Sequence, residues 1–173
     1  MRKHKGFSLI ELLIVVAIIL IIAAIAIPNL MRARMAANDS SAAASIRQIN
    51  TAEIGYFSAY PNIGFPFAMS SLGGAAPCVP GVANACLIDN NLALNGTPPG
   101  SGKSGFNFSA TSSASAGSLI NNQFYATGTP FSGTTGTRAY CSVEDAVIRL
   151  QPAGTITLVA SYNACAALNA MGQ

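Results

Sequence analysis

The sequence has little charge, no tryptophan and a single histidine. Only 9% of its 173 residues are charged, whereas a typical soluble domain has about 25%. The lone histidine, His4, excludes a metal centre made of several histidines, and its place in a basic N-terminal tail makes it a poor general base. The formal charge of +3 is too small to indicate a nucleic-acid-binding protein. The composition therefore predicts neither a catalytic site nor a bound cofactor or metal.

The apolar residues are concentrated near the N-terminus. Residues 7–27 read FSLIELLIVVAIILIIAAIAI, with Glu11 as the only charge. A helix of that length is about 31 Å long, which matches the hydrocarbon core of a bilayer. The cations Arg2, Lys3 and Lys5 precede this run, and such residues stay on the cytoplasmic side. The pattern predicts one span of the inner membrane, with the chain after Ile27 outside it.

Two simpler interpretations of this segment exist. The small residues at 24–26 fit the end of a secretory signal peptide, although the apolar run is longer than usual. An ordinary single-span anchor would also suffice, with Glu11 near the membrane edge by accident. A carboxylate inside a membrane costs roughly 2.5–3.5 kcal/mol, so it generally has a partner and a purpose.

Residues 5–12, KGFSLIEL, carry a family resemblance. This segment resembles the leader and helix start of type IV pilins and type II secretion pseudopilins. The resemblance implies that a prepilin peptidase cleaves between Gly6 and Phe7, that Phe7 is then N-methylated, and that Glu11 becomes the fifth mature residue. Pro28 also falls where type IVa pilins break their long helix. The likeness covers residues 1 to about 60.

The chemistry of Glu11 agrees with this resemblance. Cleavage creates an amine on Phe7, whose unperturbed pKa is roughly 7.7–8.0, so it can be cationic. Glu11 lies four residues further on the same helix face. It can pair with its own Phe7 as an intrachain cap, or with the Phe7 amine of a neighbouring copy. Because an unpaired buried charge is strongly disfavoured, pairing between copies would fix their stagger and favour a helical filament.

The helical pattern continues beyond the membrane segment. Pro28 cannot donate a backbone hydrogen bond, so we expect a kink or local unwinding over residues 24–28. Apolar residues at helical spacing predict one long helix from about Ser8 to Tyr60, which ends because Pro61 follows. Arg32 and Arg34 lie just past the span, where they contact lipid headgroups, a neighbouring copy or, as we favour, only solvent.

The rest of the chain predicts an α+β head. Residues 61–105 are rich in proline and glycine and are expected to be loops. Over residues 106–173, aromatic and β-branched residues indicate strands. Two are expected around Phe106–Phe108 and Phe124–Tyr125, and three more at Arg138–Val143, Ala146–Leu150 and Thr155–Ala160. A turn at residues 151–154 is expected to join the last two strands. The expected segments are therefore a leader (1–6), a transmembrane assembly helix (7–27), an amphipathic helix (28–60), a loop region (61–105), and an antiparallel sheet of three to five strands with a C-terminal region (106–173). This architecture matches the pilin fold that the resemblance implies.

The four cysteines all follow the membrane segment, so we expect them to form disulfides. Three connectivities are possible. We favour Cys78–Cys86 and Cys141–Cys165, because these nearest-neighbour loops need no unusual chain crossing. A C-terminal loop disulfide is also what the resemblance implies.

Two motifs that suggest ligands need other interpretations. The stretch GTPPGSGKS at 96–104 resembles a phosphate-binding loop, but Thr97 replaces the required first glycine, so we interpret it as a turn. Glu144 and Asp145 form an adjacent acid pair, which could bind Ca²⁺ as in major pseudopilins. Because few other acids are available, we predict no metal site.

The sequence thus predicts a structural subunit of a type IV pilus, which is not an enzyme and supports adhesion, twitching motility or DNA uptake. The alternative is a type II secretion pseudopilin that forms a periplasmic piston. The resemblance implies as partners further copies of the chain, the inner membrane, prepilin peptidase, the assembly ATPase with its platform protein, and minor pilins; no specific nucleic acid is inferred. The expected location is the inner membrane for the precursor and then an extracellular pilus.

Overall fold

The computed structural model describes residues 7–172, which form two compact units, one up to Arg34 and one from Met35 onward. A single helix, α1 (Leu9–Ala59), belongs to both units. Its ends agree with the predicted helix to within one residue. The last turn closes when the Tyr60 N–H donates to the Tyr56 carbonyl, and Pro61 then ends the helix.

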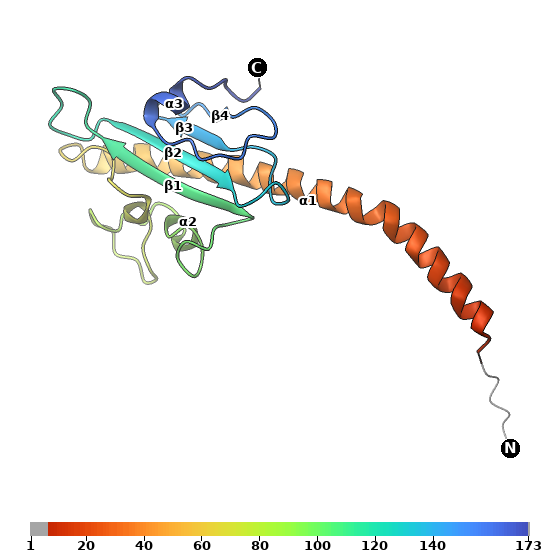
Figure 1. Ribbon diagram of the computed structural model, residues 1–173. Coiled ribbons are helices and arrows are strands. Elements are labelled where there is room, and N and C mark those ends of the chain that lie inside the picture. Colours follow the sequence, from red (N-terminus) through yellow and green to blue (C-terminus); the bar gives the residue numbers. More distant parts are fainter. Residues whose placement is uncertain (1–6, 173) are drawn as a thin grey trace. The chain divides into compact units, whose positions relative to one another are not determined.

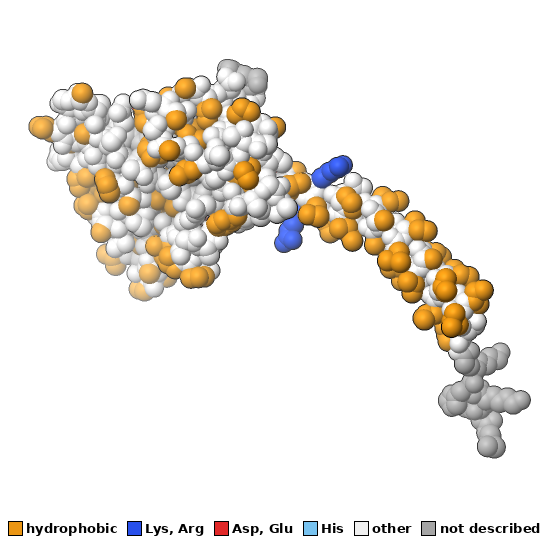
Figure 2. All heavy atoms as spheres, in the orientation of Figure 1, with side chains coloured by type: hydrophobic (Ala, Val, Ile, Leu, Met, Phe, Trp, Pro, Cys, Tyr) orange, Lys and Arg blue, Asp and Glu red, His pale blue; other side chains and the backbone are white. Residues whose placement is uncertain are grey.

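The first unit is the apolar part of α1. It contains a stretch that is long and apolar enough to cross a membrane, and none of that stretch is buried within the structure. Figure 2 shows hydrophobic side chains along the whole of this rod. We expected a kink or local unwinding over residues 24–28; the helix continues through Pro28 without interruption, which excludes the unwinding. The neighbouring turns evidently tolerate the one missing N–H group.

The second unit is an α+β head built on a four-stranded antiparallel sheet (Figure 1). Its strands are β1 (Phe106–Ser113), β2 (Gln123–Pro130), β3 (Tyr140–Val143) and β4 (Arg149–Leu150), and they lie in that order across the sheet. The register places Phe106 opposite Pro130 and Gly128 opposite Tyr140. The predicted fold class and number of strands are confirmed.

The core of the head lies between α1 and the sheet. Strand β1 alternates buried and more exposed residues, so its aromatic side chains Phe106 and Phe108 point to the helix side. They pack in one cluster with Ile46, Ile49 and Tyr56 of α1. Full burial of side chains of this size stabilises the fold by about 1.5–3 kcal/mol each, so this cluster attaches the sheet to the helix.

A polar contact, here called the clasp, attaches the loop before β3 to α1. The Asp39 carboxylate accepts hydrogen bonds from the Thr137 N–H at 3.1 Å and from its hydroxyl at 2.6 Å. One residue earlier, the Asn38 amide donates to the Thr135 carbonyl at 2.8 Å. Between these contacts, a Cβ on Gly136 would lie 2.5 Å from the Phe106 ring, so the close approach requires glycine.

The connecting segments hold only short helices. The predicted loop region 61–105 contains the 3₁₀ helix η1 (Met69–Leu72) and the single turn α2 (Asn90–Ala93), and α3 (Tyr162–Ala166) follows the sheet. The predicted strand over Thr155–Ala160 is wrong, because this segment is irregular. Within it, Val159 is buried, whereas Leu158 is 58% exposed. The Thr155 carbonyl accepts from the Ala139 N–H, but no ladder extends from this contact.

Candidate assembly site

The start of α1 is closed by its own glutamate. The Glu11 carboxylate accepts a hydrogen bond from the Ser8 N–H at 3.0 Å, and the Leu12 N–H donates to the Ser8 carbonyl at 3.3 Å. Ser8 is thus the N-cap residue of α1 and Glu11 is the third residue of the helix. A glutamate at this position commonly accepts a hydrogen bond from the backbone N–H of the N-cap residue. A negative charge in the first turn also interacts favourably with the helix dipole.

The structure does not bring Phe7 and Glu11 together. Among the described residues, the only hydrogen bond of the Glu11 carboxyl is the one from Ser8. Phe7 is 78% exposed, and in the uncut chain its nitrogen is an amide rather than an amine. Gly6, the other residue of the predicted cleavage site, lies outside the described residues. The arrangement is an intrachain cap that leaves the second carboxylate oxygen available for a further donor.

The surroundings of Glu11 are apolar and uncovered. A shallow apolar groove, which Glu11 does not line, runs along the opposite side of this helix start and is lined by Leu9, Leu12, Leu13, Val16, Ala17 and Leu20. These side chains are exposed over about half of their surface or more, and they continue in an unbroken apolar surface along the helix. On the face of Glu11 itself, the neighbours one turn on are Ile14 and Val15, which are also exposed. The carboxylate therefore has water as its neighbour only until lipid or another helix covers this face.

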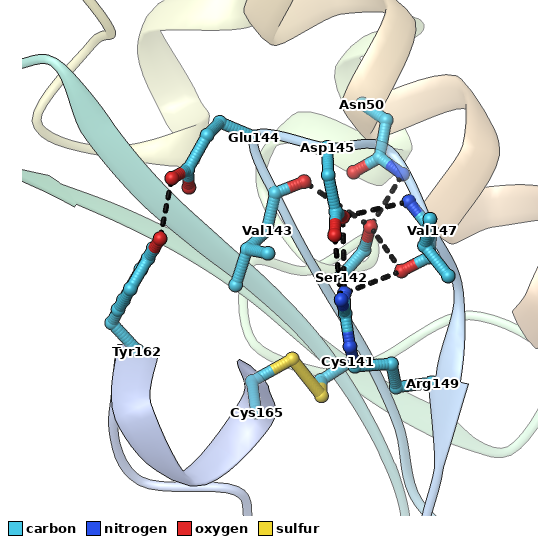
Figure 3. Close-up of polar contacts among 10 residues, drawn as sticks. All are labelled: Asn50, Cys141, Ser142, Val143, Glu144, Asp145, Val147, Arg149, Tyr162 and Cys165. Carbon is cyan, nitrogen blue, oxygen red and sulfur yellow. Dashed lines mark hydrogen bonds and ion pairs between the residues drawn. A yellow bond between two sulfur atoms is a disulfide. The ribbon is translucent and has the colours of Figure 1, made fainter. Parts of the chain in front are cut away.

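The cysteines pair as favoured from the sequence. Cys141 in β3 is bonded to Cys165 in α3, and Cys78 is bonded to Cys86 within the loop region. The Cys141–Cys165 bridge is fully buried with Val143 and Val159, and it fastens the C-terminal segment to the sheet (Figure 3). These contacts make it a structural bridge.

The acid pair Glu144–Asp145 is used for contacts within the head. Asp145 forms an ion pair with Arg149, whose Nη1 atom lies 3.0 Å from Oδ1, and this hydrogen bond lowers the pKa of Asp145. Glu144 accepts a hydrogen bond from the Tyr162 hydroxyl of α3 (Figure 3). Over residues 7–172, no group of three potential metal ligands is assembled. The calcium alternative therefore gains no support from this arrangement.

Comparisons with known proteins match the N-terminal segment. Residues 1–27 match the family described as the prokaryotic N-terminal methylation motif. The chain is also 68% identical over 40 residues to the type IV wide pilus major component PilA4 of Thermus thermophilus, and 46% identical over 56 residues to the type IV major pilin protein PilA of Myxococcus xanthus. The N-terminal segment of this chain is therefore similar to that of type IV pilins. The prediction of this family from residues 5–12 is confirmed.

The similarity to these pilins is confined to part of each chain. The match to PilA4 covers 23% of this chain and 30% of the relative, and the match to PilA covers 32% and 26%. The chain thus aligns with less than a third of the length of the curated relatives it matches. No solved structure matches it significantly. The pilin similarity therefore describes α1, and the head has to be interpreted from its own residues.

One residue of α1 was not predicted as important. Glu53 interrupts the apolar stripe of α1 in sequence, yet it is fully buried in the head. Neither carboxyl oxygen has a hydrogen-bond partner among the described residues, and the same is true of the Asn50 side-chain oxygen one turn earlier. Burial raises the pKa of Glu53 from its ordinary value of 4.5 to about 8. Its position within the stripe, four residues after Ile49 and three before Tyr56, was the signal that could have revealed its burial.

Proposed function

We propose that this chain is the precursor of a type IV pilus subunit, a structural protein without catalytic activity. Prepilin peptidase would cut between Gly6 and Phe7 and methylate the new Phe7 amine. The mature chain would contribute residues 7–27 to the filament core, with the amphipathic residues 28–60 beneath the head. The observation that carries this proposal is the matched methylation motif, joined to an apolar helix that no part of the chain covers.

Glu11 would then make the contact that registers one subunit on the next. In the uncut chain its carboxylate satisfies the Ser8 N–H, and its neighbours one turn on, Ile14 and Val15, are exposed apolar side chains. After cleavage, the methylated Phe7 amine of a neighbouring copy supplies a cation for that carboxylate. A carboxylate paired with a cation is tolerated in an apolar core, whereas an unpaired one is not. Copies related by any other stagger would leave a charge without a partner, so one stagger is preferred.

The remaining partners and the location follow from assembly. The precursor would span the inner membrane before it enters the filament. Assembly needs the peptidase, an assembly ATPase with its platform protein, and minor pilins, because no motor motif is present in this sequence. The filament would extend outside the cell and support adhesion, twitching motility or DNA uptake. Two disulfides and a head with little charge suit such an exposed fibre.

Mass spectrometry of fibres sheared from the native host tests the proposal. The fibre subunit is expected to begin with methylated Phe7. The variant Gly6→Val should leave an intact leader and no fibres. Gly133→Val is the matched control, because a Cβ at Gly133 has open space around it and fibres should persist.

Two results would decide against this proposal. Fibre subunits that begin at Met1 would exclude the processing step. A processed chain that stays in the periplasm, and whose loss stops protein export, would instead identify the pseudopilin alternative.

A further inference from the structure

Most of the head is almost free of charge. The 84 residues from 54 to 137 include only two charged residues, Asp89 and Lys103. These two form an ion pair with each other, at 3.9 Å. We call residues 54–137 the neutral segment. The face of the head in Figure 2 is accordingly almost entirely orange and white.

The neutral segment holds a fully exposed leucine in a rigid loop. Leu119 lies between β1 and β2 and is the most exposed of the large hydrophobic residues described. Its loop is closed by hydrogen bonds between Ser115 and Asn122, at 2.7 and 2.8 Å, and by the Ser118 hydroxyl, which donates to the Ile120 carbonyl at 2.7 Å. The loop therefore presents Leu119 to solvent in a fixed position, so little conformational entropy is lost when a partner binds.

A second loop is bonded to the first. The Phe65 N–H donates to the Asn121 carbonyl at 2.7 Å, and the Asn121 N–H donates to the Ile63 carbonyl at 3.1 Å. A Cβ on Gly64 would lie 2.0 Å from the Asn121 carbonyl oxygen, and the positive φ of Gly64 also favours glycine. This second loop exposes Phe67 over 74% of its surface. Two joined loops thus present large apolar side chains within the neutral segment.

We propose that the neutral segment, anchored by Leu119, is the surface through which the head contacts a second copy of this chain. This inference rests on the proposed filament. Identical surfaces that carry net charge repel each other, but two neutral surfaces can approach without an electrostatic cost. Burial of exposed apolar side chains then favours the contact, by about 25 cal/mol for each Å² removed from water.

A second copy is favoured over an unrelated apolar partner by concentration. In a filament the helical core holds every head beside other heads, so the contact forms at a high effective concentration. Even a weak apolar contact is then populated along the whole fibre. The contact has no need of charge pairing, so it should be insensitive to salt, unlike a contact made by surface ion pairs.

Site-specific photocrosslinking in intact fibres tests this contact. The photoreactive residue p-benzoylphenylalanine replaces Leu119 in one variant and Leu158 in the control variant. Leu158 is also an exposed leucine, but it lies outside the neutral segment. Irradiation at low and high salt should join position 119 to residues 54–137 of another copy, with equal yield, and several-fold more often than position 158. Adducts only to other molecules, adducts to residues outside 54–137, or equal yields at the two positions would overturn the proposal.

The variant Leu119→Ser separates folding from contact. Because Leu119 contributes little to the core, the detergent-solubilised subunit should unfold at the same denaturant concentration as the unmodified subunit. Fibres of the variant should dissociate at a lower temperature, whereas Leu158→Ser fibres should not. Unchanged fibre dissociation would overturn the inference while leaving the pilus proposal intact. Absence of fibres from the unmodified chain would instead contradict the pilus proposal.

Discussion

The two ends of α1 each carry one glutamate, and the two carboxyls are in opposite situations. Glu11 lies on an exposed apolar rod, where it caps its own helix. Glu53 is buried in the head, where neither oxygen has a partner among the described residues. The head buries an apolar core within one chain, whereas the apolar side chains of residues 9–34 are left uncovered. The comparison indicates that one part of the helix is completed by folding and the other by lipid or assembly.

The largest expected effect comes from Glu11→Gln. The amide keeps the size of the side chain but cannot neutralise a neighbouring amine, and an unpaired charge costs roughly 2.5–3.5 kcal/mol in apolar surroundings. We therefore expect normal insertion of the precursor and at least a tenfold loss of surface fibres, because about 1.4 kcal/mol corresponds to a factor of ten. Fibre yield is measured by shearing and electron microscopy.

Ser8→Ala is the matched control for Glu11. It changes the same helical turn but leaves both the carboxylate and the Ser8 backbone N–H in place. Fibre yield should stay close to normal. If both variants lose their fibres equally, a general need for the helix start would explain the result, and a specific role of the Glu11 charge would be refuted.

Glu53→Gln should change how the stability of the head depends on pH. The pKa of Glu53 is 4.5 in ordinary surroundings and about 8 in the folded head, so between these values only the folded state holds the proton. Stability contributed by that proton is fully present below pH 4.5. It falls by about 1.4 kcal/mol per pH unit as the pH rises to about 8. Denaturant unfolding of the full chain in detergent from pH 5 to 8 should show this slope, and Glu53→Gln should remove it.

An exposed acid on the same helix provides the control for Glu53. Gln48→Glu places a carboxyl on the exposed side of α1, where no burial acts on it. Its unfolding profile should keep the slope of the unmodified chain. An equal slope in the Glu53→Gln variant would show that the buried carboxyl is not the group that titrates.

Loss of the Cys141–Cys165 bridge should have a smaller effect. Replacement of both cysteines by alanine is expected to reduce the free energy of unfolding by about 3 kcal/mol, because the bridge joins two residues that are 24 positions apart in the sequence. The Cys78–Cys86 bridge closes a separation of only 8, so its double alanine variant should lose less. Denaturant unfolding compares the two variants, and the reverse order would contradict this assignment.

The smallest expected effect is that of Asp39→Ala in the clasp. The variant leaves the Thr137 N–H and hydroxyl without their acceptor, at a cost of about 1–3 kcal/mol. Unfolding of the full chain measures the loss. Ser40→Ala is the control, because among residues 7–172 the Ser40 hydroxyl donates only to the Ala36 carbonyl of the same helix. Equal losses in both variants would indicate a helix effect rather than a loss of the clasp.

Local patterns in the sequence predicted much of the fold. The apolar run, the helical spacing and Pro61 predicted α1, since each acts within a few residues. Aromatic residues around Phe106 and Phe124 predicted β1 and β2. The predicted strand at Thr155–Ala160 failed, because alternation alone does not supply a neighbouring strand to pair with.

The buried glutamate and the clasp could not be predicted in the same way. Asp39 and Thr137 are 98 residues apart, so no local pattern relates them. Glu53 would normally be assigned to a solvated face, because burial of a carboxyl is costly unless it is protonated or paired. Its place in the apolar stripe between Ile49 and Tyr56 was a signal for burial, and the packing of the sheet on α1 decides between the two assignments. The pairing of Glu11 with other copies, proposed from the sequence, would be a property of the filament and not of a single chain.

The bridge between Cys141 and Cys165 also constrains the order of events in biogenesis. Cys165 follows all four strands in the chain, so the bridge closes only after the sheet has been synthesised. If the head is exported as proposed, oxidation takes place outside the reducing cytoplasm. Covalent closure would then act as a maturation checkpoint, and subunits that stay reduced would be exposed to periplasmic proteases before they reach a growing fibre.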